Sequence, residues 1–285
     1  MSVIGVHAPG AMGVALARCL RAGGHDVLTT AAGRSAATAR RLADAGLDDA
    51  GSLDAVVRRS EVLISVVPPG RAREAAGGIA AACTRTDARP LVVEANAVAP
   101  AAVVGIAAEL PTDLVDAAIS GPPPTPGAER PTRVFVSGER AGEVAALVVP
   151  GVRWVPIEGG TGAASAAKMC TASVRKGHQA LLAHALLTAE HHGVLDTVLA
   201  DLALDLPGDT IRSAATAAAK AWRFADEMDE IAATQEGAGL GPDLFTAIAG
   251  VYRRLATSEW GALRPEDLPA HPSSPAGLRP RDGNT

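Results

Sequence analysis

The sequence predicts an α/β protein in which a doubly wound parallel sheet is followed by an all-helical domain. Between residues 2 and 156, short β-branched runs alternate with alanine-rich stretches that are long enough for crossover helices. From residue 163 to 258 the strand-like runs almost disappear and helical periodicity takes over. With 285 residues, 48% apolar and 20% charged, the chain is long enough for two domains with a sizeable core.

Taken in order, the elements of the first domain are short apolar strands separated by helices. We expect strands at residues 3–7, 26–30, 62–67, 91–95, 114–119 and 133–136. Helices are expected between them, for example over 14–22 and 71–82.

The second domain reads as several amphipathic helices. Breaks are expected at Gly193, at Pro207-Gly208 and over residues 237–242, where glycine and proline interrupt the pattern. Beyond Gly261, five prolines and little apolar material predict a flexible tail. We therefore expect domains over residues 1–158 and 159–262, and a tail over 263–285.

Composition excludes several classes of protein. A formal charge of −5 and an aromatic content of 2% argue against a nucleic-acid binder, which needs basic and stacking surfaces. The sequence contains no stretch of eighteen consecutive apolar residues, so no membrane-spanning helix is expected. Cys19, Cys83 and Cys170 are far apart and lack CxxC spacing, so neither a disulfide framework nor a metal site is expected. Without a signal-peptide pattern at the N-terminus, we expect a cytoplasmic location.

A glycine-containing turn follows the first predicted strand. It reads Ala8-Pro9-Gly10-Ala11-Met12-Gly13, and a helix is expected from about Val14. This order of strand, turn and helix is typical of the Rossmann-type dinucleotide site: Gly10 lets the backbone approach a pyrophosphate, and Gly13 lets the helix pack closely. Ala8 replaces the first glycine of the GxGxxG pattern, so a generic tight turn remains the alternative.

The end of the second predicted strand bears on the choice of coenzyme. NAD sites usually place a carboxylate there for the ribose 2′-hydroxyl, whereas an arginine accommodates the 2′-phosphate of NADP. This chain has no acid at that position and instead carries Gly33, Arg34 and Ser35. We therefore favour NADP(H) over NAD(H), with a solvated arginine at the start of the next helix as the alternative.

Four short motifs together resemble a known family. They are Gly10-Ala11-Met12-Gly13, Val66-Val67-Pro68-Pro69, Ser120-Gly121-Pro122, and Gly162 followed six residues later by Lys168-Met169. Their order and spacing are similar to those of the β-hydroxyacid dehydrogenase superfamily, which includes 6-phosphogluconate and 3-hydroxyisobutyrate dehydrogenases. The second half resembles the branch whose C-terminal domain is DUF1932. The resemblance implies a helical domain like that of 6-phosphogluconate dehydrogenase, and coenzyme contacts at Val67, Pro68 and Asn96.

The resemblance also implies that Lys168 is the general acid/base. Reduction of a carbonyl needs hydride on carbon and a proton on oxygen, and an amine beside the nicotinamide can exchange that proton. The chain has only three lysines, which draws attention to this one. A helix-surface lysine with a solvated ammonium is the alternative.

Further residues are expected at the substrate. By resemblance, Ser120, Gly121 and Pro122 hold a substrate carboxylate, although Ser, Gly and Pro also make ordinary turns. Asn96 is expected near the nicotinamide and substrate, whereas an Asx-turn or a helix cap would place an asparagine there equally well. Lys176, eight residues after Lys168, is either a second cation for the substrate or a solvated side chain.

Two departures from the family limit how far a substrate can be transferred. Many members carry an asparagine one turn after the lysine, where this chain has Ala172. The run of prolines between residues 122 and 126 replaces a glycine-rich loop.

The sequence thus predicts an NADPH-dependent oxidoreductase that interconverts a small (β-)hydroxy acid and its carbonyl form. An imine reductase, which reduces a C=N bond on the same scaffold, is the first alternative. A protein that senses NADPH without turnover is the second. A small molecule is the expected substrate, and the long C-terminal helices predict a homodimer.

Overall fold

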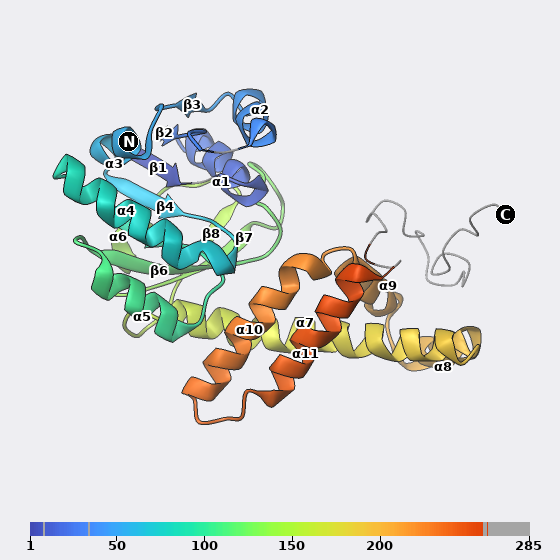
Figure 1. Ribbon diagram of the computed structural model, residues 1–285. Helices are drawn as coiled ribbons and strands as arrows, with labels where there is room; N and C mark the ends of the chain where they lie inside the picture. Colours follow the sequence, from blue (N-terminus) through green and yellow to red (C-terminus); the bar gives the residue numbers. More distant parts are fainter. Residues whose placement is uncertain (8, 34, 259–260, 262–285) are drawn as a thin grey trace. The chain divides into compact units, whose positions relative to one another are not determined.

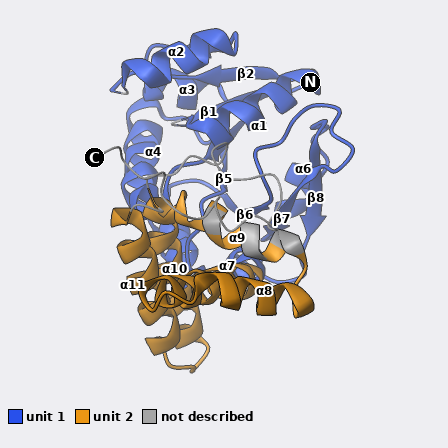
Figure 2. Cartoon of the chain, turned by 90° about the vertical axis from the view of Figure 1, so that its right-hand side faces the viewer, with its two compact units in different colours: residues 1–169 blue, residues 170–285 orange. Residues whose placement is uncertain are grey.

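The computed structural model describes residues 1–7, 9–33, 35–258 and 261. Ala8, Arg34 and the expected tail over 263–285 therefore lie outside the described residues. The chain divides into two compact units, residues 1–169 and 170–285 (Figure 2).

Unit 1 is built on an eight-stranded sheet with the strand order β3-β2-β1-β4-β5-β6-β7-β8. The strands are β1 (Val3–His7), β2 (Asp26–Thr29), β3 (Asp48–Asp49), β4 (Val62–Ser65), β5 (Leu91–Glu94), β6 (Leu114–Ser120), β7 (Thr132–Ser137) and β8 (Val152–Pro156). The chain runs from β1 outward to β2 and β3, then returns to β4 on the other side of β1. This reversal creates a crevice at the carboxyl ends of β1 and β4, where open α/β sheets bind ligands.

Helices cover both faces of the sheet (Figure 1). One apolar cluster joins the sheet to α1 (Ala11–Ala22), α2 (Ala36–Asp44) and α6 (Ala141–Ala145). A second cluster on the other face includes α3 (Leu53–Arg59), α4 (Ala72–Thr86) and α5 (Pro100–Glu109), with a short 3₁₀ turn η1 (Pro69–Arg71) before α4. The doubly wound α/β arrangement expected from the sequence is confirmed.

The sheet departs from the expected all-parallel pattern at one place. The described strands pair in parallel except β6 with β7, which is antiparallel. The connection over residues 121–131 contains the run Pro122-Pro123-Pro124 and Pro126 and no helix. Because a parallel return needs a crossover, this connection brings the chain back in the opposite direction.

Three smaller differences have local causes. The two-residue β3 and the edge strand β8 were not predicted. β3 is formed by two aspartates, which carry no apolar signal, and β8 has only five residues, with an arginine inside and a proline at its end. Helix α1 begins at Ala11, earlier than expected from the first run of apolar residues.

Unit 2 and the helix that leads into it are helical throughout the described part. The elements are α7 (Ala163–His191), α8 (Leu195–Asp205), α9 (Gly208–Ala218), α10 (Ala221–Gly237) and α11 (Asp243–Thr257). Gly193, Pro207 and residues 238–242 separate these helices as predicted, whereas the break at Lys220 was missed because an alanine run precedes it. None of the described helices combines the length and apolar character that crossing a membrane requires.

Candidate active site

The turn after β1 presents open backbone at the start of α1. Gly10 is the N-cap residue of α1, and its carbonyl accepts a hydrogen bond from the Val14 N–H at 2.9 Å. A Cβ atom built on Gly10 would meet nothing within 4 Å, so this glycine leaves room for a ligand. The first N–H groups of a helix have no intrahelical acceptors and favour an anion such as a phosphate.

Gly13 has a packing function instead. Its added Cβ would lie 3.3 Å from the Cβ of Pro9 and 3.5 Å from the Cγ1 of Val6. The absence of a side chain therefore lets α1 approach β1 closely. Pro9 is buried, while Ala11 and Met12 occupy the first turn of α1.

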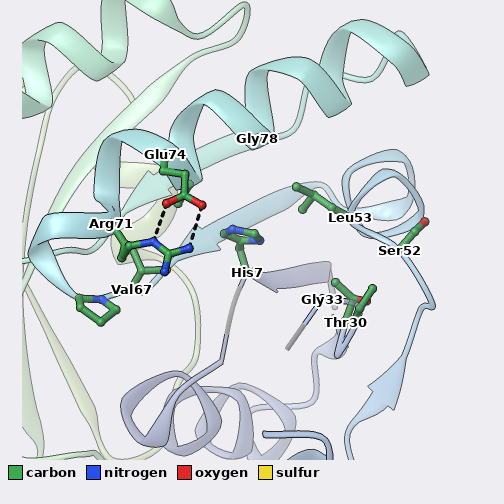
Figure 3. Close-up of a pocket in the computed structure, with 12 residues that line it drawn as sticks. His7, Thr30, Gly33, Ser52, Leu53, Val67, Arg71, Glu74 and Gly78 are labelled. Carbon is green, nitrogen blue, oxygen red and sulfur yellow. Dashed lines mark hydrogen bonds and ion pairs between the residues drawn. The ribbon is translucent and has the colours of Figure 1, made fainter. Parts of the chain in front are cut away.

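A cavity of about 430 Å³ opens next to this turn, at the ends of β1, β2 and β4 (Figure 3). It is lined by His7, Thr30, Ala32, Gly33, Ser52, Leu53, Val67, Pro68, Arg71, Glu74, Ala75 and Gly78. Its size is within the range of small-molecule sites, and its mixture of apolar and polar walls fits a nucleotide. The predicted coenzyme residues Gly33, Val67 and Pro68 are among the lining residues.

Sequence reasoning missed most of the cavity wall. His7 is the last residue of β1 and Thr30 directly follows β2, so the end of each predicted strand was the available signal. Ser52 and Leu53 come from the start of α3, whose position depends on tertiary packing. Since no motif marks those residues, the sequence alone could not assign them.

Among the described residues, Arg71 contributes a positively charged side chain to the wall of this cavity. Its Nε lies 2.5 Å from Glu74 Oε2, and both side chains are more than half exposed. The hydrogen bond to Glu74 raises the pKa of Arg71 above its usual value. Exposed pairs of this kind contribute little to stability, so a bound phosphate could compete with Glu74 for the guanidinium.

The predicted coenzyme residue Ser35 caps the next helix. Its Oγ accepts a hydrogen bond from the Thr38 N–H at 3.3 Å, and Gly33 before it has a φ of +71°. The coenzyme contact of Ser35 stays a prediction, as do those of Arg34 and Ala8, which lie outside the described residues.

Asn96 braces the ends of two neighbouring strands. Its Oδ1 accepts a hydrogen bond from the Val67 N–H at 2.5 Å, and its Nδ2 donates to Ser65 Oγ at 3.3 Å. The side chain is 2% exposed. Asn96 thus fixes the Val67-Pro68 turn that lines the cavity, while its direct contact with coenzyme or substrate stays a prediction.

Glu94, which sequence reasoning did not single out, is the buried last residue of β5. Burial raises its pKa to about 8, hydrogen bonds from Asn96 and Ser65 act in the opposite direction, and the charge of Asp116 raises the pKa further. Glu94 is therefore a neutral acid at pH 7. Its appearance in an otherwise apolar strand was the signal in the sequence.

These groups belong to a polar row that crosses five strands. The strand register pairs His7 with Ser65, Ser65 with Glu94, Glu94 with Asp116, and Asp116 with Ser137. Register partners on adjacent strands point to the same face of a sheet. The row therefore runs from the wall of the cavity at β1 to β7.

At its far end, the polar row anchors the first turn of α7. Asp116 Oδ2 accepts hydrogen bonds from the N–H groups of Gly162 and Ser165, both at 3.0 Å, and Oδ1 accepts one from Ser165 Oγ at 2.7 Å. Ser137 Oγ accepts from the Ala164 N–H at 2.9 Å. Lys168 is partly buried and lies three residues beyond Ser165, so the two share a helix face.

The residue before α7, Gly162, has to be a glycine because of its backbone angle and its close neighbours. Its φ is +103°, and an added Cβ would lie 3.3 Å from the Cβ of Pro100. Pro100 is the first residue of α5, four residues after Asn96. The glycine therefore allows the start of α7 to approach the segment that follows β5.

The predicted carboxylate-binding turn follows β6. Ser120, the last residue of β6, is buried and lies opposite Arg133 of β7. Thr132 Oγ1 donates a hydrogen bond to the Pro122 carbonyl at 2.8 Å, and an added Cβ on Gly121 would lie 3.3 Å from Thr132 Cγ2. The turn is thus held against β7, and its contact with a substrate stays a prediction.

Lys176 is neither solvated nor isolated. Its ammonium is paired with the carboxylate of Glu227 on α10 and lies 4.0 Å from the centroid of the Phe224 ring. The two paired side chains are 15% and 9% exposed. Tyr252 donates a hydrogen bond to the Lys176 carbonyl at 2.8 Å. The predicted role of Lys176 at a substrate is not tested by these contacts.

The described residues contain no group of His, Cys, Asp and Glu side chains that could hold a metal ion.

Family models match a segment in each half of the chain. Residues 1–147 match the family model of the NAD-binding domain of 6-phosphogluconate dehydrogenase. Residues 189–255 match DUF1932, a domain of unknown function. Among the curated proteins, none matches this sequence significantly.

Solved structures extend the likeness over nearly the whole chain. A conserved protein of unknown function, described as similar to 3-hydroxyacid dehydrogenases, is 28% identical with a TM-score of 0.64; the match covers 92% of this chain and 100% of that one. Mycobacterium tuberculosis 3-hydroxyisobutyrate dehydrogenase is 20% identical, with coverage of 92% and 96% and a TM-score of 0.68. Streptomyces aurantiacus imine reductase is 18% identical, with coverage of 88% and 93% and a TM-score of 0.53. The last two likenesses concern the fold.

Proposed function

The chain belongs to the family defined by the NAD-binding domain of 6-phosphogluconate dehydrogenase, and so to the NAD(P)-dependent oxidoreductases; on this premise we propose that it interconverts a small (β-)hydroxy acid and its carbonyl form with NADP(H). The observation that carries the proposal is the anchoring of the first turn of α7 to β6 and β7. Lys168 follows this turn on the face that carries Ser165. A lysine held there is suited to acid/base chemistry at the carboxyl ends of the strands.

The coenzyme fits the residues present. Gly10 leaves space for a pyrophosphate, the start of α1 favours its charge, and the cavity beyond has room for the adenosine half. When bound, the coenzyme supplies or accepts the hydride. Val67 and Pro68 form a wall of its site, and Asn96 holds their turn in place.

The proton is assigned to Lys168. In reduction, its ammonium gives a proton to the carbonyl oxygen as the carbon receives hydride; in oxidation, the neutral amine takes the hydroxyl proton back. Ser120 and the backbone N–H of Gly121 orient the substrate carboxylate. We assign coenzyme binding and the Ser120-Gly121 turn to the domain over 1–158, and the remaining substrate contacts, with dimerisation, to the helical domain over 159–262.

A substrate panel tests this proposal. Small 3-hydroxy acids with NADP⁺, and the corresponding carbonyl acids and cyclic imines with NADPH, are assayed by the change in NADPH absorbance. We expect turnover with hydroxy and carbonyl acids that is lost in Lys168→Ala. Absence of turnover with every compound, alongside tight NADPH binding, would instead favour the sensor.

The imine reductase remains a second candidate because of one position on α7. Ala172, which is 5% exposed, occupies the place where many hydroxyacid dehydrogenases carry an asparagine. The fold is also shared with an imine reductase. Turnover confined to cyclic imines would favour this candidate, whereas dependence on Lys168 with carbonyl acids argues against it.

The preference for NADP(H) rests on Arg34 and on the absence of an acid after β2. We expect Arg34→Asp to raise the KM for NADPH at least tenfold, since the attraction of a positive side chain for the 2′-phosphate is replaced by repulsion. The KM for NADH should change little. An unchanged ratio of the two KM values would remove Arg34 from the coenzyme site.

We also propose a homodimer, formed through the C-terminal helices, and a cytoplasmic location. Val174 and Leu181, seven residues apart on α7, are 72% and 70% exposed, and apolar residues at this spacing share a helix face. Light scattering measures the mass in solution, and a mass of one chain that persists at all concentrations would contradict the dimer.

A further inference from the structure

We propose that Asp116 is the positioning residue of the active site: from the interior of the sheet it fixes the first turn of α7 and keeps a negative charge at the start of the helix that carries Lys168. The inference rests on the acid/base role proposed for Lys168. It adds a residue that touches neither substrate nor coenzyme and acts through the lysine.

Asp116 acts as a clamp, because its carboxylate holds the first turn of α7 to β6 through several hydrogen bonds. It is fully buried, and four donors point at its two oxygens: the Gly162 and Ser165 N–H groups, and the Ser165 and Ser137 hydroxyls, at 2.7 to 3.2 Å. Two of these donors are the otherwise unsatisfied N–H groups of a helix start. A single side chain thereby ties β6 to the helix that carries Lys168.

Ser137 completes the clamp from the next strand. Its hydroxyl donates to Asp116 Oδ2 at 3.2 Å and accepts from the Ala164 N–H at 2.9 Å. The first turn of α7 is therefore held on two strands, and Gly162 allows its close approach to Pro100. This arrangement leaves the first turn of α7 little freedom, which is what a proton-transferring side chain one turn later requires.

The pattern of donors favours a negative charge on Asp116. The two backbone N–H groups and two hydroxyls that donate to its oxygens are the partners that stabilise a carboxylate. Its register partner Glu94 is the neutral member of the pair, because burial raises its pKa to about 8 and the charge of Asp116 adds to the effect. The pair thus holds one negative charge, located beside α7.

That charge bears on the proton that Lys168 carries. A helix start has positive potential, which disfavours an ammonium in the next turn, and a carboxylate at the cap opposes it. The groups that face Asp116 through described contacts are Glu94 on β5, which titrates, and Ser137 and Ser165, which do not. Removing the charge of Asp116 should therefore make Lys168 lose its proton more readily.

The direct test is Asp116→Asn, which keeps the size of the side chain and removes the charge. Asp113→Asn is the matched control, because Asp113 precedes the same strand but is exposed and paired with Arg140. In Asp116→Asn we expect kcat for carbonyl reduction to fall about fivefold or more, with the KM for NADPH unchanged. The high-pH limb of the kcat profile should move to lower pH by about half a unit. The control should keep both values.

Acetylation of the three lysines gives a readout that needs no turnover. The protein without coenzyme is labelled with trace acetic anhydride, and Lys168 is compared with Lys220 by mass spectrometry. In Asp116→Asn we expect the ratio to rise about two- to fivefold, since more of the Lys168 amine is neutral. An unchanged ratio in folded Asp116→Asn, together with an unchanged kcat profile, would overturn the proposal.

Ser165→Ala keeps the test decisive if Asp116→Asn fails to fold. This variant retains the charge but loses one bond of the clamp, so we expect kcat to fall about two- to tenfold while the labelling ratio stays at the wild-type value. Wild-type kcat in Ser165→Ala would overturn the positioning role. Failure of the proposed function looks different: wild-type turnover would then be indifferent to Lys168→Ala, whatever the labelling ratio shows.

Discussion

The two units of the molecule differ in the groups that stabilise a buried charged side chain. In unit 1, Asp116 is satisfied by neutral donors from β7 and the start of α7. In unit 2, Lys176 is neutralised by Glu227 and packed over Phe224. A charge held by neutral dipoles keeps its influence on its surroundings, whereas an ion pair largely cancels its own field.

Because of this difference, we expect the two lysines of α7 to have different roles. Lys168 follows a turn that the carboxylate of Asp116 holds in place, so replacing Lys168 should lower the rate of the reaction. Lys176 belongs to a buried ion pair with Glu227, so replacing Lys176 should lower the free energy of unfolding of the helical unit. We therefore expect opposite outcomes for two substitutions that are only eight residues apart.

The largest effect is expected from Lys168→Ala. Loss of a general acid typically costs about 10²- to 10⁴-fold in rate, while NADPH binding and the free energy of unfolding should stay close to wild-type values. Steady-state kinetics and coenzyme titration measure the two effects separately. Near-normal turnover would erase the distinction between the lysines.

A different loss is expected from Lys176→Met. Removing one member of a buried ion pair leaves the other charge without compensation, and the free energy of unfolding should fall by about 3 kcal/mol. The double variant Lys176→Met/Glu227→Leu should recover most of this loss. Chemical denaturation measures both. Unchanged stability combined with lost turnover would reverse the assignment and make Lys176 a substrate cation.

The smallest effect concerns Glu94, the neutral neighbour of Asp116. Its pKa is about 8 in the folded protein against 4.5 for an ordinary glutamate, so the folded state keeps a proton that the unfolded chain releases. This contribution to stability is complete below the ordinary value and is lost as the pH rises through about 8. Glu94→Gln should flatten that dependence, by about 2 kcal/mol between about pH 5.5 and 7. An identical slope in the variant would mean that Glu94 is ionised when folded.

Much of the fold followed from the sequence because its signals are local. The β-branched runs that form β1, β4 and β5, the Gly10 turn and the change to helical periodicity after residue 160 each depend on neighbouring residues. Strand β7 was predicted, but its antiparallel direction was missed, because strand direction depends on the length and content of the preceding connection.

The site was predicted less completely, for a related reason. Lys168 and Gly10 stand in short motifs, whereas the polar row is created by strand register. Ser65, Glu94, Asp116 and Ser137 are separated by 21 to 29 residues in the chain and become neighbours only in the sheet. Likewise, nothing near Lys176 in the sequence indicates Glu227, which lies 51 residues away.

The most direct test is a crystal structure of the complex with NADP⁺ and a hydroxy acid that turns over. We predict that Lys168 Nζ lies within hydrogen-bond reach, about 3 Å, of the substrate hydroxyl, beside the nicotinamide ring. The pyrophosphate should rest on the turn at Gly10. An ammonium at position 168 that faces bulk solvent, remote from the nicotinamide, would contradict the account.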